Sequence, residues 1–115
     1  MTKRKSIDFL KDMISAIDLI AEFINGLTFE TFENDQKTIF AVSKAVEIVG
    51  EASKQIPIEI RKQYPDIPWQ DMARVSDKMV HHYFGLNLKI LWNTATNDLP
   101  TLKPLLLNIL DRLVE

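Results

Sequence analysis

The sequence contains no cysteine, only three glycines, no long hydrophobic run and no excess of basic residues. The lack of cysteine excludes disulfide frameworks, thiolate nucleophiles, thiolate zinc sites and iron–sulfur clusters. The apolar runs are too short to span a bilayer. After the basic start, the charged residues Asp8, Lys11 and Asp12 interrupt any signal-peptide core. We therefore expect no membrane segment and a cytoplasmic location.

The charge balance limits the partners of this chain. Its 14 basic and 16 acidic side chains give a formal net charge of -2, so no global cationic field recruits nucleic acid. Any contact with nucleic acid must therefore be local. With 46% hydrophobic and 26% charged residues, the composition is typical of a folded protein. A length of 115 residues predicts a single domain over residues 1–115.

Two long amphipathic helices are predicted in the first half. The first carries an apolar stripe at steps of three and four and ends at Asn25-Gly26, a good left-handed stop. Its stripe consists of Ile7, Leu10, Ile14, Ile17, Ala21 and Ile24, and is widened by Met13 and Ile20. The second is capped by Asp35 and carries Ile39, Val42, Val46, Val49, Ser53 and Ile56. Gly50 lies inside it and allows either close helix packing, which is the commoner explanation, or access of something bound to the backbone. Short helical segments are expected over 27–33 and 57–64.

Three further helices are expected in the second half, over residues 68–84, 87–97 and 99–113. Pro68 suits the first helical position, Gly85 ends the first of the three, and leucines at 102, 106, 110 and 113 share a face of the last. No alternating strand pattern competes with these segments. The sequence therefore predicts an all-α, up-and-down bundle of four to five helices.

Adjacent histidines, His81 and His82, mark the one obvious place for catalysis. Arg74, Asp77 and Lys78 share a helix face with His81, where an imidazole can move a proton and a guanidinium can hold a phosphate. The alternative is a solvated, ion-paired helix face. His82 points about 100° away from His81, so the two cannot chelate one metal ion from a single face. We expect no metal site and no cofactor.

The sequence resembles a known family over most of its length. The segments IPWQDMARVSDKMVHHYFGLNLKILW at residues 67–92, DLPTL at 98–102 and AVEIVGEASKQIP at 45–57 are similar to the HepT-like branch of the HEPN superfamily. This resemblance implies a helical bundle that forms a homodimer. It also implies a metal-independent ribonuclease toxin of a type VII-like toxin–antitoxin pair, with RNA (tRNA or mRNA) as substrate and a nucleotidyltransferase as antitoxin.

The motif of that family is an arginine, a spacer of four to six residues, a histidine and, after one more residue, a tyrosine. His81 and Tyr83 match its second half. In the commonest spacing the arginine directly precedes Asp77, but this chain has Ser76 there. Arg74, with six residues intervening, satisfies the looser motif. Three explanations stay open: Arg74 substitutes, the enzyme is naturally degenerate, or an arginine was replaced to make a toxic protein tolerable.

The resemblance also implies a role for each motif residue. His81 is the proton-transfer group for attack of a ribose 2′-hydroxyl on the adjacent phosphate, and the motif arginine steadies the anionic transition state. Ser76 brings no positive charge, so the rate of RNA cleavage drops if Arg74 cannot reach the phosphate. Asp77 orients His81 or the arginine, or is simply an exposed acid. Tyr83 matches the tyrosine on which the antitoxin places AMP.

A second function class fits the same residues. If Arg74 faces solvent, a non-catalytic helical module that still binds a nucleotidyltransferase partner is favoured over a ribonuclease. Glu47 and Glu51, one turn apart on the second long helix, either approach the site or are solvated acids, and we favour the second interpretation. Trp69 and Trp92 are interpreted as core or interface anchors rather than stacking platforms for bases.

Overall fold

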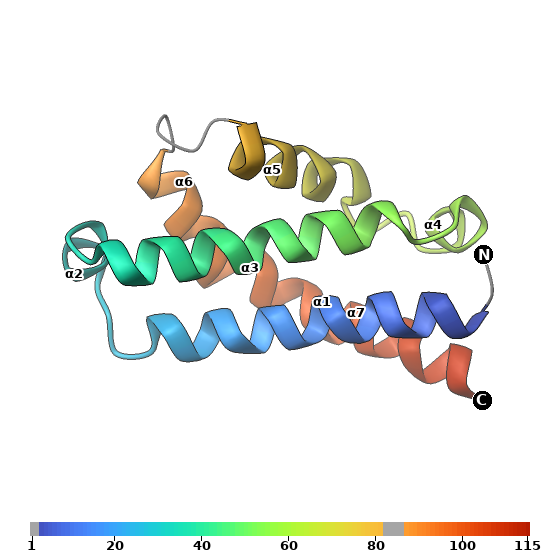
Figure 1. The fold of residues 1–115 in the computed structure, drawn as a ribbon. Helices are drawn as coiled ribbons and strands as arrows, with labels where there is room; N and C mark the ends of the chain where they lie inside the picture. The colour runs from blue at the N-terminus through green and yellow to red at the C-terminus, as the bar shows by residue number, and fades with distance from the viewer. Residues whose placement is uncertain (1–2, 82–86) are drawn as a thin grey trace.

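The computed structural model describes residues 3–81 and 87–115, and every regular element within those ranges is helical (Figure 1). The elements are α1 (Lys3–Ile24), α2 (Phe29–Glu33), α3 (Gln36–Lys54), α4 (Ile58–Gln63), α5 (Trp69–His81), α6 (Leu88–Asn93), the π-helical segment η2 (Thr94–Asp98) and α7 (Leu99–Val114). The predicted all-α bundle is confirmed. None of the described helices is long and apolar enough to cross a membrane.

The helix α3 occupies the middle of the bundle. It runs antiparallel to α1 on one side and contacts α5 on the other, while α7 packs against α1 (Figure 1). The core between these helices is apolar, and its fully or almost fully buried side chains include Leu10, Met13, Ile20, Phe32, Val42, Leu106 and Ile109. Burying each such side chain contributes about 1.5–3 kcal/mol, so the amphipathic stripes account for the association of the helices.

The predicted helix ends in the first half are present. Gly26 adopts a positive φ of 79°, a backbone conformation that glycine reaches without steric cost, and so ends α1. Asp35 caps α3, because its Oδ1 accepts a hydrogen bond from the Thr38 backbone N–H at 3.1 Å. The short segment before it forms α2, capped by reciprocal hydrogen bonds between Thr28 and Thr31.

One member of the predicted stripe of α1 lies on the wrong side. Ala21 is exposed, whereas Met13 and Ile20 are fully buried. The prediction that Met13 and Ile20 widen the stripe is confirmed, and the contacts of α1 with both α3 and α7 account for this wide buried face. The assignment of Ala21 to the stripe is wrong.

The predicted break between residues 97 and 99 is also wrong. The backbone keeps helical angles at Asn93, Thr94, Asp98 and Leu99, so α6, η2 and α7 form one continuous path. The N–H of Leu99 donates to the carbonyl of Thr94, which is a π-type hydrogen bond. Pro100 has no N–H, a feature typical of a helix start, but here the wider π turn leads into it and the helix continues.

Candidate functional site

The closest approach of two helices near the predicted motif is the crossing of α3 and α5 at Gly50. A Cβ atom added at residue 50 would lie 2.1 Å from Cβ of Ser76 and 2.6 Å from the backbone oxygen of Met72. No side chain fits between atoms so close. The interpretation of Gly50 as a close-packing residue is confirmed, and the crossing fixes α5 against α3 at the motif.

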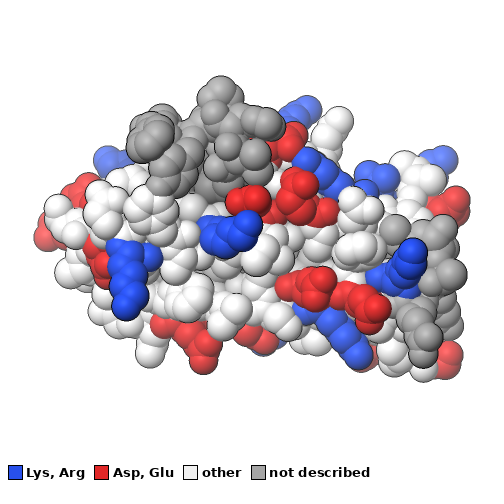
Figure 2. Space-filling view, in the orientation of Figure 1, with Lys and Arg blue, Asp and Glu red and all other residues white. Residues whose placement is uncertain are grey.

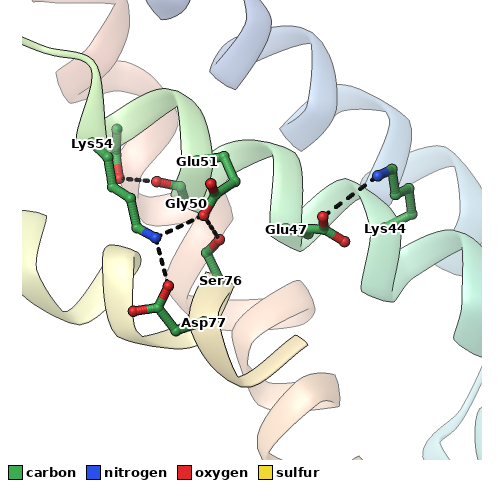
Figure 3. A network of polar contacts seen from close by, with 8 residues as sticks. Lys44, Glu47, Gly50, Glu51, Lys54, Ser76 and Asp77 are labelled. Carbon is green, nitrogen blue, oxygen red and sulfur yellow. Dashed lines mark hydrogen bonds and ion pairs between the residues drawn. The ribbon is translucent and has the colours of Figure 1, made fainter. Parts of the chain in front are cut away.

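Ser76, which the sequence motif predicted to stand in the place of an arginine, is buried in this crossing. Its side chain is 0% exposed, and its hydroxyl donates a 2.5 Å hydrogen bond to Oε2 of Glu51 on α3 (Figure 3). A buried hydroxyl needs such a partner, since an unpaired one costs about 1–3 kcal/mol. Ser76 therefore does not reach the surface itself, but its hydroxyl holds the exposed carboxylate of Glu51.

Lys54 extends from α3 to the same carboxylate and onward to α5. Its Nζ lies 2.8 Å from Oε2 of Glu51 and 2.5 Å from Oδ1 of Asp77 (Figure 3). The side chain of Lys54 is 33% exposed, and those of Glu51 and Asp77 are 51% and 56% exposed. The four side chains of Glu51, Lys54, Ser76 and Asp77, called here the crossing cluster, join a buried hydroxyl to the solvent-facing side of α5.

Hydrogen bonds within the crossing cluster shift two pKa values. The contact with Asp77, followed by that with Glu51, raises the pKa of Lys54 above its usual value. The contact with Lys54, followed by the hydroxyl of Ser76, lowers the pKa of Glu51. Both shifts favour the charged forms, so the cluster holds one ammonium between two carboxylates at neutral pH.

Arg74 does not join the crossing cluster. Its side chain is 65% exposed, and its guanidinium lies 3.5 Å from Oδ1 of Asp71, three residues earlier on α5. Asp77, for which a role in orienting the arginine was one expectation, pairs instead with Lys54. The structure thus separates Arg74 from Ser76 and Asp77, although all three belong to one helix.

The remaining predicted residues lie partly or wholly outside the described part of the structure. His81 is the last residue of α5, four positions and about one turn after Asp77. The side chains of Lys78 and His81 lie outside the described part of the structure, as do His82 and Tyr83 entirely. Their expected roles stay predictions.

Two members of the crossing cluster were not among the predicted site residues. For Glu51 an approach to the site was one alternative, but a solvated acid was the favoured interpretation, and Lys54 was not considered. The spacing of Glu51 and Lys54, three residues apart on one helix, predicts their mutual ion pair. Their contacts with Ser76 and Asp77 join residues more than 20 positions apart, so they required the helix crossing to be known.

The surface around the crossing cluster carries both signs of charge. In Figure 2 the Lys and Arg side chains of the described residues are scattered among acidic ones. Among the side chains that the structure describes, no three of His, Cys, Asp or Glu come together as a metal site would require. At the crossing cluster itself, the cation Lys54 is held by two carboxylates.

Both tryptophans act as the packing anchors that were predicted. Trp69 is buried, and its indole N–H donates to the Tyr64 carbonyl at 3.1 Å. Trp92 packs on the rings of Phe29 and Phe32, with centroids 6.4 and 5.0 Å apart. Neither is a free platform on which a base could stack.

Comparison with known proteins identifies a family and several relatives. A family model described as "Ribonuclease HepT-like" matches residues 13–109. A Thermococcus cleftensis protein named "Probable ribonuclease HepT" is 50% identical over 101 residues, which cover 88% of this chain and 92% of the relative. No solved structure matches this chain.

Two more distant relatives carry similar names. "Putative RNase MJ0127" of Methanocaldococcus jannaschii is 41% identical over 100 residues, covering 87% of this chain and 83% of that protein. "Putative RNase TTE0752" of Caldanaerobacter subterraneus is 33% identical over 104 residues, covering 90% and 93%. The similarity therefore extends over nearly the whole bundle, including the α3–α5 crossing.

Proposed function

This chain belongs to the HepT-like ribonuclease family of the HEPN superfamily, and from that premise we propose that it is a metal-independent endoribonuclease toxin. The observation that carries the proposal is the match of the family over residues 13–109, which spans the crossing cluster and His81. The names of the relatives support RNA as the class of substrate. We propose tRNA or mRNA as the RNA that is cut.

The proposed reaction is an internal transfer within the RNA strand. His81 takes the proton of a ribose 2′-hydroxyl while the 2′-oxygen forms a bond to the adjacent phosphorus. The bond from phosphorus to the 5′-oxygen of the next nucleotide breaks, and that oxygen receives a proton. The products are a 2′,3′-cyclic phosphate and a free 5′-hydroxyl, so the reaction needs no cofactor.

The motif offers no guanidinium beside Ser76 to supply the positive charge needed at the phosphate. Ser76 is buried and neutral, and Arg74 turns to Asp71 rather than toward the crossing cluster. Loss of one well-placed donor to a transition state lowers a rate by about 10²–10³-fold. We therefore expect this chain to be slower than its Ser76→Arg variant, in which a guanidinium stands next to Glu51.

A nucleotidyltransferase antitoxin is the proposed partner of this toxin, and Tyr83 is its proposed target. AMP on Tyr83 would place a bulky anion two residues from His81 and repel RNA phosphates. Co-expression with such an enzyme followed by intact-mass measurement tests this. We expect the mass of AMP on the parent chain and none on Tyr83→Phe; equal masses would contradict the assignment.

We also propose that the toxin acts in the cytoplasm as a homodimer. The mixed charges around the crossing cluster support this, because two copies facing each other concentrate the few local cations (Figure 2). Sedimentation at working concentrations is the test, and a monomer would contradict it.

A second candidate function is a non-catalytic helical module that binds a nucleotidyltransferase. The exposure of Arg74 and its pairing with Asp71 favour this alternative, since they leave the motif without a guanidinium beside Ser76. The two candidates differ in whether His81 is needed for any activity.

The deciding experiment is RNA cleavage in the presence of a metal chelator by the parent, Ser76→Arg and His81→Ala. His82→Ala is the matched control, because it removes the neighbouring imidazole, to which no catalytic role is assigned. We expect cleavage by the parent, faster cleavage by Ser76→Arg, and none by His81→Ala. Silence from every variant would favour the binding module.

A further inference from the structure

We propose that Lys54 is the phosphate-binding cation of the ribonuclease site and that the Asp77 carboxylate occupies it in the free protein. This inference rests on the proposed function and names the group that supplies the charge Ser76 lacks. It assigns to α3 a role that the motif places on α5.

The geometry brings the ammonium of Lys54 to the stretch of α5 that carries the motif. Its Nζ lies 2.5 Å from Oδ1 of Asp77, and Asp77 precedes His81 by about one helical turn. Arg74, the cation expected from the sequence, pairs with Asp71 instead. Lys54 therefore brings a positive charge to the position one turn before His81.

Glu51 and Ser76 explain why the lysine stays in this position. Oε2 of Glu51 accepts from both the Ser76 hydroxyl and Lys54 Nζ, so a buried donor fixes the carboxylate that anchors the lysine. An arginine at position 76 would compete for the same carboxylate. With serine there, the carboxylate remains available to hold Lys54 over α5.

The contact between Lys54 and Asp77 is suited to replacement of the Asp77 carboxylate by a phosphate. An ammonium has three N–H donors, and here Glu51 and Asp77 each accept one. Asp77 is 56% exposed, so it can turn into solvent while Glu51 keeps the lysine in place. A phosphate oxygen then takes the place of the Asp77 carboxylate oxygen, so the ammonium has two anionic partners before and after the exchange.

The experiment is single-turnover cleavage of a labelled single-stranded RNA oligonucleotide with chelator present. The variants are Lys54→Met, Lys54→Arg, Asp77→Asn and the double variant Lys54→Met/Asp77→Asn. Lys44→Met is the matched control, since Lys44 is also on α3 and paired with an acid three residues away, Glu47. Circular dichroism and thermal unfolding of every variant establish that each is folded.

We expect Lys54→Met to lose about 10²-fold in rate. Lys54→Arg should lose less, because it keeps the positive charge, and Lys44→Met should stay near the parent. Asp77→Asn should cleave several-fold faster, because an amide competes poorly with phosphate for an ammonium. The double variant should be as slow as Lys54→Met, because removing the competitor cannot help once the cation is gone.

Three outcomes would overturn the inference. A double variant restored to the parent rate would mean that Lys54 only neutralises Asp77, and an unchanged rate in Lys54→Met would mean that it does neither. Cleavage by Ser76→Arg with a silent parent would overturn the role of Lys54 yet leave the proposed function intact. Silence from both the parent and Ser76→Arg would instead overturn the proposed function.

Discussion

The apolar core and the α3–α5 crossing hold the same bundle together in different ways. In the core, large side chains such as Leu10, Phe32 and Leu106 are fully buried and fill the space between helices. At the crossing, Gly50 and Ser76 leave almost no space, and polar groups take over from apolar ones (Figure 3). The core therefore supplies stability, whereas the crossing fixes a set of charges relative to the end of α5.

This difference determines which changes each region tolerates. A core of large apolar side chains loses stability in proportion to the volume removed, and small rearrangements absorb part of the loss. At the crossing the two helices are already in close contact, so an added atom has no room. Each polar side chain of the crossing cluster also depends on a partner from the other helix. Substitutions there should change the position of α5 and the ionisation of the crossing cluster more than the overall stability.

The largest expected effect is in the core. Leu10→Ala removes a fully buried side chain and should lower the free energy of unfolding by about 2–5 kcal/mol. Urea unfolding followed by circular dichroism measures this change. The matched control is Leu19→Ala on the same helix, since Leu19 is 44% exposed. Equal losses from the two variants would contradict the described core.

A single methyl group at the crossing should have the next largest effect. Gly50→Ala gains about 1 kcal/mol in helix propensity but forces Ser76 and the Met72 backbone away, at a cost of about 1–3 kcal/mol or more. We expect a net loss of stability together with a loss of RNA cleavage. Ala45→Gly on the same helix is the control, because it should lose stability without moving α5. Wild-type stability in Gly50→Ala would contradict the close contact.

Removing the buried hydroxyl should have a smaller effect. Ser76→Ala deletes the hydrogen bond to Glu51 and should cost about 1 kcal/mol or less. Ser15→Ala, in an exposed position of α1, is the control. Thermal unfolding checks the stability, and the cleavage assay checks whether Lys54 still acts without the fixed carboxylate. A rate equal to that of the parent would argue against an anchoring role for Ser76.

The smallest expected effect is a change in pH dependence. The pKa of Glu51 is lowered from 4.5 in the folded chain, so its ionised form adds stability above that pH. This contribution is lost as the pH falls through the lowered pKa of the folded state. Glu51→Gln should therefore be less stable than the parent near neutral pH and approach it in acid. Unfolding midpoints between about pH 7 and 3 test this sign, with Glu59→Gln as a control for losing one exposed carboxylate.

Much of the fold could be predicted from local sequence signals. Asp35 and Gly26 determine helix ends through interactions within a few residues, and the apolar stripes indicate which faces pack. The break before Leu99 was predicted wrongly because Pro100 is compatible with both a helix start and a π turn. Ala21 was assigned to the core because a stripe does not reveal how many neighbours a helix has.

The site was less predictable for a related reason. The spacing on α5 identified His81, Asp77 and the unusual Ser76, which are all local to one helix. The contacts that organise the described part of the site, from Glu51 and Lys54 across to α5, depend on the Gly50 crossing. Sequence spacing also grouped Arg74 with Asp77, whereas Asp71 is its partner in the structure.

The measurement that tests the central claim most directly compares one oligonucleotide sequence as RNA and as DNA, each incubated with the parent chain and with His81→Ala in a chelator. If the chain is a ribonuclease that uses the substrate's 2′-hydroxyl, only the parent should cut, only the RNA should be cut, and the products should carry a 2′,3′-cyclic phosphate. Cleavage of the DNA, or cleavage of the RNA by His81→Ala at the parent rate, would contradict the account.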